Sequence, residues 1–257
     1  MSSDRRDPLH RFSNRVADYI RYRPGYPPEL VTWLRAETGI SPSWLVADMG
    51  SGTGLLSREF LRLGCTVYGV EPNDEMRAAA EREFARALKF HSVSGKAEAT
   101  TLSDRFVDLV SAGQAFHWFD PPATRREWHR IVKTGGYALV VFNSRLHDAT
   151  PFMRVYDDYL IEHAIDYARV DHQRGLADKL NTVFDTFVEA RFPFTLRHRY
   201  DDVRGLSMSS SYVPPPGHPR HEEFFRGLQA QFDDYAVDGM VEFAYETEAY
   251  LSRLGAV

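Results

Sequence analysis

The sequence predicts an α/β fold in which helices cover both faces of a largely parallel sheet. Between residues 44 and 142, short apolar runs alternate with segments of helical spacing, which is typical of parallel strands joined by crossover helices. A glycine-rich turn follows the first apolar run, and an acidic residue, Glu71, ends the second. The pattern therefore predicts the fold class and indicates where a ligand would approach the backbone.

The individual elements follow in order along the chain. Strands are predicted at residues 44–49, 66–70, 88–93, 106–111 and 137–142. Helices are predicted at residues 12–22, 29–38, 55–63, 74–86 and 123–132. The helix at 29–38 is expected to stop at Gly39, because glycine readily adopts the left-handed conformation that ends helices.

After residue 143 the alternation of strands and helices stops. Helices are predicted at 151–168, 175–190 and 221–235, and strands at 194–200 and 240–245. No linker or repeat divides the chain, so we expect one domain over residues 1–257. Its expected parts are an N-terminal helical cap (1–40), a core (41–144), a helical insertion before the last two strands (145–192) and a C-terminal part that completes the sheet (193–257).

Composition places the chain among ordinary globular proteins. It has 257 residues with 31 Lys+Arg against 36 Asp+Glu, a net charge of -5, which argues against a broad electrostatic contact with nucleic acid or an anionic membrane. The single cysteine, Cys65, excludes an intrachain disulfide and a cysteine-based zinc site, and we predict no metal site. The polar start and the lack of a long apolar run favour a cytoplasmic location without a membrane segment.

The glycine-rich turn has the spacing Asp-x-Gly-x-Gly-x-Gly over residues 48–54, between a predicted strand and a predicted helix. Glycines let a ligand approach the backbone, and the N–H groups at a helix start favour negative or electron-rich ligand atoms. A dinucleotide fingerprint would need glycine at 55 or 57, where Leu55 and Ser57 stand. No Gly-Lys-Ser/Thr follows, so the turn is not a P-loop either.

Three further blocks lie at the ends of later predicted strands. Glu71 ends the second strand, where an acid can accept hydrogen bonds from both hydroxyls of a ribose. The block Gly-Lys-Ala-Glu at 95–98 follows the third strand, and Gln-Ala-Phe-His-Trp-Phe at 114–119 follows the fourth.

These four blocks, in this order, resemble the class I S-adenosylmethionine (SAM)-dependent methyltransferases. The resemblance is strongest to the small-molecule branch that includes trans-aconitate methyltransferase-type proteins. Tyr-Arg-Pro-Gly-Tyr-Pro at 22–27, the block at 114–119, and the segment at 209–219 with its Ser-Ser-Ser-Tyr-Val-Pro start are typical of that branch. The resemblance covers nearly the whole chain and is loose over 145–200.

The resemblance implies a Rossmann-like sheet of seven strands, mostly parallel with the last strand antiparallel, and SAM lying across the strand ends. The turn would hold the methionine part of SAM, Glu71 the ribose, and Asp48 the amino group. The residues expected to bind SAM, or the product S-adenosylhomocysteine (SAH), are Tyr19, Arg23, Asp48, Gly50, Ser51, Gly52, Gly54, Glu71, Pro72, Met76, Ala97, Glu98 and Gln114.

For the acceptor we expect a small molecule that is methylated on oxygen, either a carboxylate or a hydroxyl. The leaving group is a neutral thioether, so the protein mainly has to align the two reactants for SN2 transfer. His117 is a candidate general base or hydrogen-bond partner, or else a structural histidine. Tyr26, His117, Trp118 and Tyr212 are the candidate acceptor-binding residues.

Several alternatives stay open at this point. Arg23 could meet an anionic substrate or the carboxylate of SAM, or it could lie on a solvated helix face. The chain could also methylate a protein or another substrate, bind SAM without turnover, or, against its glycine spacing, be an NAD(P)-dependent oxidoreductase. The sequence does not distinguish a monomer from a homodimer.

Overall fold

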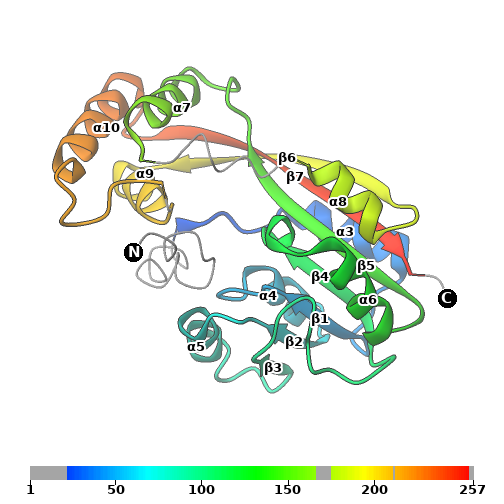
Figure 1. Ribbon diagram of the computed structural model, residues 1–257. Coiled ribbons are helices and arrows are strands. Elements are labelled where there is room, and N and C mark those ends of the chain that lie inside the picture. Colours follow the sequence, from blue (N-terminus) through cyan, green and yellow to red (C-terminus); the bar gives the residue numbers. More distant parts are fainter. Residues whose placement is uncertain (1–21, 166–174, 211, 255–257) are drawn as a thin grey trace.

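A seven-stranded sheet organises the chain in this computed structural model, which describes residues 22–165, 175–210 and 212–254 (Figure 1). Within these residues the strand order is β3-β2-β1-β4-β5-β7-β6. The strands are β1 (Leu45–Met49), β2 (Thr66–Val70), β3 (Phe90–Val93), β4 (Val107–Gly113), β5 (Val132–Arg145), β6 (Val188–His198) and β7 (Val241–Arg253).

The directions of the strands confirm the predicted mixed sheet. Pairs from β3 to β5 are parallel, whereas β7 is antiparallel to both of its neighbours, β5 and β6. β7 therefore fills the place between two strands that run the same way. The Rossmann-like, mostly parallel fold with an antiparallel last strand is the one the sequence predicted.

Three of the helices start at a side chain that caps them. The bounds of the helices are α3 (Pro28–Thr38), α4 (Leu55–Arg62), α5 (Asp74–Glu83), α6 (Pro121–Ile131), α7 (Pro151–His163), α8 (Leu176–Val183), α9 (Tyr200–Met208) and α10 (His221–Tyr235). Asn73 accepts two backbone N–H groups at the start of α5, and Asp120 and Thr150 each accept one at α6 and α7. Gly39 ends α3 with a φ of 70°, as predicted.

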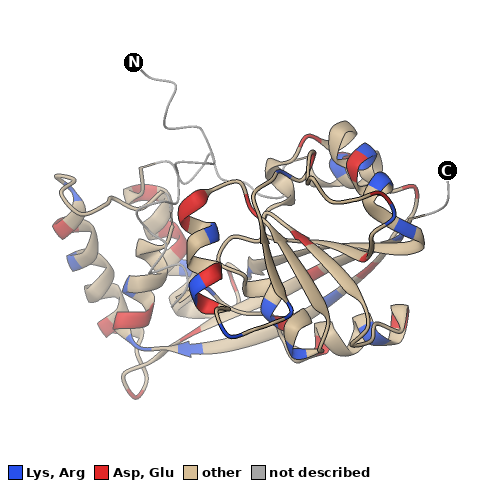
Figure 2. Cartoon of the chain, turned by 90° about the horizontal axis from the view of Figure 1, so that it is seen from below, with Lys and Arg blue, Asp and Glu red and all other residues tan. Residues whose placement is uncertain are grey.

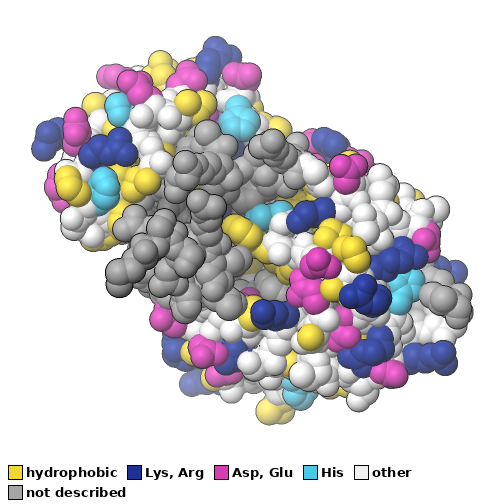
Figure 3. All heavy atoms as spheres, in the orientation of Figure 1, with side chains coloured by type: hydrophobic (Ala, Val, Ile, Leu, Met, Phe, Trp, Pro, Cys, Tyr) yellow, Lys and Arg dark blue, Asp and Glu magenta, His cyan; other side chains and the backbone are white. Residues whose placement is uncertain are grey.

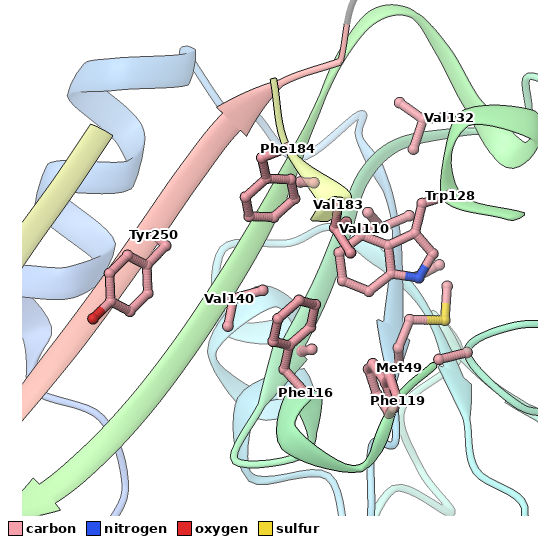
Figure 4. Packing of buried hydrophobic residues seen from close by; sticks show 14 of the residues in the cluster. Met49, Val110, Phe116, Phe119, Trp128, Val132, Val140, Val183, Phe184 and Tyr250 are labelled. Atoms are coloured by element: carbon pink, nitrogen blue, oxygen red, sulfur yellow. The ribbon is translucent and has the colours of Figure 1, made fainter. Parts of the chain in front are cut away.

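The two faces of the sheet have separate hydrophobic cores, because alternate strand residues point to opposite sides. On one face α6 and α8 cover the sheet around Phe116, Trp128 and Phe184, whose rings lie together in Figure 4. On the other face α3 and α4 bring Leu30 and Phe60 against the strands. This double cover holds the carboxyl ends of the parallel strands in place.

A third core lies where the long strands β6 and β7 run past the rest of the sheet. α7, α9 and α10 gather at that end, away from α6 and α8 (Figure 1). Phe152 and Tyr156 pack there against Phe243 of β7, and Phe224 belongs to the same core. We call α7, α9, α10 and the strand segments 194–198 and 241–245 the helical lobe.

Two details after residue 143 differ from the sequence expectations. The helix expected at 175–190 ends at Val183, and β6 begins at Val188, because residues 188–198 pair in unbroken register with β7. Helix α9, at 200–208, was not expected. The two helices expected between 145 and 192 also separate: α7 packs on α10, and α8 packs on α6. The helix expected at 12–22 falls almost entirely outside the described residues.

Acidic and basic side chains are mixed over the surface of the described residues. Figure 2 shows both signs on the helices and loops, and the face in Figure 3 carries them side by side. Among these residues, none of the helices is both long enough and apolar enough to cross a bilayer.

Candidate active site

A cavity of about 740 Å³ lies between the carboxyl ends of β1, β4 and β5 and the helical lobe. Ligands of α/β sheets bind at such strand ends, and the volume is in the range of small-molecule sites. Eight of the residues expected to bind SAM or the acceptor line it: Arg23, Tyr26, Asp48, Gly50, Ser51, Gly52, Gln114 and Tyr212.

The glycine turn forms one end of the cavity, which we call the donor end. Gly50, Gly52 and Gly54 all have positive φ, at 61°, 57° and 89°. A Cβ on Gly50 would meet Ala115 at 2.7 Å, and one on Gly54 would strike the ring of Phe84. A Cβ on Gly52 would meet nothing within 4 Å. Packing thus requires two of the glycines, while Gly52 leaves its backbone open to the cavity.

Glu71 holds this turn from the neighbouring strand. Its carboxylate accepts the Gly52 N–H at 2.8 Å and the Asn73 N–H at 2.9 Å. Burial raises the pKa of Glu71, and these two hydrogen bonds oppose the rise. Glu71 does not itself line the cavity, so its contact with a ribose stays a prediction.

Asp48 is a buried carboxyl group that faces the cavity. It accepts hydrogen bonds from Ser57 Oγ at 2.6 Å and Ser111 Oγ at 2.9 Å. Burial raises the pKa of Asp48 to about 6, against the effect of those hydroxyls, and the charge of Glu71 adds to the rise. A cation bound beside Asp48 would favour its charged form.

Gln114 and Asn143 join three strands at the middle of the cavity. The Gln114 side chain donates to the Asn143 carbonyl at 3.1 Å from a backbone with φ of 59°. The Asn143 amide donates to the Gly25 carbonyl at 3.0 Å and accepts from Thr247 Oγ1 at 2.7 Å. The segment with Pro24 and Tyr26 is thereby attached to β5.

The other end of the cavity, the acceptor end, is formed by side chains from separate elements. Arg145 ends β5 and lies 3.2 Å from Asp157 Oδ1, and its guanidinium stands over the ring of Tyr156. It also donates to the hydroxyl of Tyr212 at 3.5 Å. Tyr245, on β7, is directly opposite Arg145 in the strand register.

The remaining predicted residues do not line the cavity. They are Gly54, Glu71, Pro72, Met76, Ala97, Glu98, His117 and Trp118; Tyr19 lies outside the described residues. Met76 and Ala97 are buried, and Glu98 accepts the backbone N–H of Asp120 at 2.9 Å. Their contacts with SAM stay predictions.

His117 is in a short 3₁₀ helix, Phe116–Trp118, behind the cavity wall. Its ring lies 4.6 Å from that of Trp118 and 6.2 Å from that of Phe142, a lining residue. Lys179 of α8 donates to the carbonyls of His117 and Phe119 at 2.6 and 3.2 Å. The catalytic role of His117 stays a prediction.

Sequence reasoning missed most of the acceptor end. Asn143, Ser144, Arg145, His147, Arg191, Tyr245, Glu246 and Glu248 all line the cavity. Residues 143–145 could have been found, because they directly follow the predicted strand at 137–142, at the edge of the sheet where ligands bind. The residues from β6 and β7 carry no local signal, since only strand pairing brings them there. Among the described residues, no group of three His, Cys, Asp or Glu could hold a metal ion.

The sheet is Rossmann-like, and the cavity lies at the carboxyl ends of its central strands. The sequence profile of a methyltransferase domain family matches residues 47–140. A methyltransferase-like protein of Schizosaccharomyces pombe, itself uncharacterized, is 30% identical over 253 residues, which is 95% of this chain and 96% of that protein. The chain belongs to the class I SAM-dependent methyltransferases.

Other similarities agree with this family. An uncharacterized methyltransferase of Mycobacterium tuberculosis is 36% identical over 145 residues, and the match spans 56% of this chain but only 57% of the relative. A solved structure of a candidate type II methyltransferase from Anaeromyxobacter dehalogenans superposes with a TM-score of 0.67 at 21% identity, over 92% of this chain and all of that one. That structure supports the fold. None of these proteins identifies the trans-aconitate-type branch.

Proposed function

We propose that this chain transfers the methyl group of SAM to an oxygen atom, in a carboxylate or hydroxyl, of a small molecule. The observation that carries the proposal is the single cavity that joins the glycine turn to a polar pocket in the helical lobe. A methyltransferase of this kind has to hold a donor and an acceptor in line, and this cavity offers one place for each.

The donor end fits SAM. Gly52 presents an open backbone where a side chain would otherwise stand, and Asp48 offers a carboxyl group that a cation would charge. We assign the turn to the methionine part, Asp48 to its amino group and Glu71 to the ribose. SAM when bound supplies an activated methyl group on a positive sulfur. The protein residues have to orient that group and exclude water, which is where most of the rate gain of such a reaction lies.

The acceptor end supports oxygen rather than amine methylation. Arg23 and Arg145 both line the cavity, and their positive charges disfavour an ammonium-bearing acceptor. A carboxylate acceptor has no proton to lose and needs no base. A hydroxyl acceptor needs one, and His117, the candidate from the sequence, lies outside the cavity lining.

The test is a titration with SAH followed by a turnover assay. Calorimetry should give a 1:1 complex with SAH and no heat with NAD(H). The variant Gly52→Ala should weaken SAH binding at least tenfold, because its Cβ projects into the donor end. Gly239→Ala is the matched control, since Gly239 also has a positive φ (68°) and nothing within 4 Å of a Cβ; it should leave the affinity unchanged.

Turnover is then measured as SAH formed from SAM over a panel of small carboxylic acids, phenols, amines and peptides. Formation of SAH with acids or phenols supports the proposal. Turnover confined to peptides would make the chain a protein methyltransferase, and SAH binding without turnover on any acceptor would leave a SAM-binding module. Absence of SAH binding would contradict the proposed function itself.

A further inference from the structure

The hydroxyl of Tyr245 is the most unusual polar group at the acceptor end. Tyr245 is 3% exposed and lines the cavity, and its hydroxyl oxygen has no hydrogen-bond partner among the described residues. Burying a hydroxyl without a partner costs free energy. The ring itself is fixed, because it stacks on Phe194 with 5.2 Å between the ring centroids. The acceptor end therefore contains a rigid, buried hydroxyl group without a partner among the described residues, on a residue of the cavity wall.

Arg145 presents a positive charge next to this hydroxyl. Arg145 and Tyr245 are opposite each other in the antiparallel pair of β5 and β7, so their side chains leave the same face of the sheet. The guanidinium is held by Asp157 Oδ1 at 3.2 Å and by the Tyr156 ring at 5.1 Å. Such a fixed guanidinium pairs well with a planar or tetrahedral anionic oxygen group.

Arg23, from the segment before α3, brings a second positive charge to the cavity lining. Its Nε donates to Ser209 Oγ at 3.0 Å and its Nη2 reaches Ser210 Oγ at 3.4 Å. Burial would raise the pKa of Tyr212, yet the charges of Arg145 and Arg23 hold that pKa below its usual value. The lowered pKa is the response of a buried phenol to a positive potential at this end of the cavity.

The acidic groups near this place are occupied by other partners. Asp157 is shared by Arg145 and by His147 Nδ1, at 2.5 Å. Glu246 accepts from Arg191 at 2.9 Å, and Glu248 accepts from Ser144 Oγ at 2.7 Å. Asp157 therefore balances part of the charge of Arg145, and the positive charge of Arg23 adds to what remains.

We propose that Arg145, Arg23 and the Tyr245 hydroxyl bind an anionic oxygen group of the acceptor, a carboxylate or a phosphate, remote from the atom that is methylated. This subsite deepens the proposed function, since it defines the acceptor as a molecule with an anionic group at the end opposite the reacting oxygen. The two arginines supply the attraction, and the phenol supplies a hydrogen bond from a hydroxyl that has no partner among the described residues.

The experiment compares anionic ligands with neutral compounds that share their carbon skeleton. Glutarate is titrated against dimethyl glutarate, and phenyl phosphate against phenol, into the chain saturated with SAH. Each anion should bind at least tenfold more tightly than its neutral counterpart, and the tighter of the two anions identifies the source as carboxylate or phosphate. If neither anion binds more tightly than its neutral counterpart, the subsite does not exist.

Tyr245→Phe removes one oxygen atom from a well-packed ring and should weaken the tighter anion about tenfold. Tyr159→Phe is the matched control, because its hydroxyl donates to the Phe224 carbonyl outside the cavity; it should leave anion binding unchanged. Arg145→Lys keeps a charge beside Asp157 and should weaken binding several-fold. Unchanged anion binding in Tyr245→Phe would overturn the proposal.

The same titrations without SAH separate this proposal from the proposed function. The subsite consists of residues of this chain alone, so anion binding that depends on Tyr245 should persist in the absence of SAH. Anion binding without any SAH binding would reject the methyltransferase proposal and keep the subsite. SAH binding without anion selectivity would reject the subsite and keep the methyltransferase proposal.

Discussion

The two ends of the cavity are made in different ways. The donor end comes from one continuous stretch, residues 48–54, and its key groups are backbone atoms and the space left by glycine. The acceptor end comes from Arg23, Arg145, Tyr212 and Tyr245, which are far apart in the sequence and meet through strand pairing and side-chain contacts. The donor end therefore depends on the conformation of one turn. At the acceptor end, a substitution can replace one side chain and leave the backbone of the others in place.

The largest effect is expected from Gly54→Ala, at the donor end. Its Cβ would strike Phe84 and its φ of 89° is unfavourable for alanine, so overpacking and strain together should cost about 2–4 kcal/mol of unfolding free energy. Urea denaturation measures this. Gly217→Ala, with a φ of 84° and no atom near its Cβ, should lose only about 1 kcal/mol. Equal losses would show that packing does not set the turn.

Asp48→Asn, in contrast to Gly54→Ala, should raise the unfolding free energy. We expect this gain in the ligand-free protein above pH 6. The pKa of the folded wild type is raised from 3.8 to about 6 by burial, so wild-type stability is full below pH 4 and declines as the pH rises through 6. The variant escapes this decline and should gain up to about 3 kcal/mol at pH 8. Urea titrations at pH 4, 6 and 8 test this, with the exposed Asp234→Asn as control. A gain that does not grow with pH would contradict it.

Lys179→Met addresses the turn at 116–119, where the ring of His117 lies 6.2 Å from that of the lining residue Phe142. Losing the bonds to the His117 and Phe119 carbonyls should cost about 1–2 kcal/mol of stability. Lys89→Met is the matched control, because Lys89 also bonds two carbonyls, of Gly64 and Pro42. In the Lys179 variant we expect a raised KM for the acceptor and an unchanged SAH affinity. In the Lys89 control we expect the KM to stay unchanged. A weaker SAH complex would assign the turn to the donor end.

The smallest effect is expected from His117→Ala. Its ring stands behind Phe142 rather than in the lining, so turnover should fall less than tenfold and SAH affinity less still. His91→Ala, which removes a histidine stacked on Tyr68 at 4.8 Å, is the control for lost ring packing. A fall in kcat of about 100-fold or more would instead identify His117 as a general base.

The sequence predicted the donor half of the molecule closely, for a physical reason. β2 is found at 66–70 as expected, and Gly39 ends α3, because apolar runs, caps and glycines act within a few residues. The glycine turn was predicted from equally local information, the spacing of its glycines between a strand and a helix. Its three glycines differ in role, however, and only the positions of Ala115 and Phe84 around the turn reveal that.

The helical lobe was predicted less well because its structure depends on distant partners. Residues 188–190 have a helical pattern but form strand, since all of β6 pairs with β7. Tyr245 is an ordinary aromatic residue in the sequence and acquires its meaning only opposite Arg145. Tyr212 and Arg23 were predicted from the resemblance, and the structure brings both to the cavity.

The position of β7 between β5 and β6 has a consequence for folding during synthesis. β5 and β6 emerge from the ribosome well before residues 241–253, so each waits with an open edge that could pair with another chain. The sheet closes only when β7 enters that gap, and the same event places Tyr245 beside Arg145. A nascent chain could thus complete its glycine turn early, while its second pocket comes into being with the last strand.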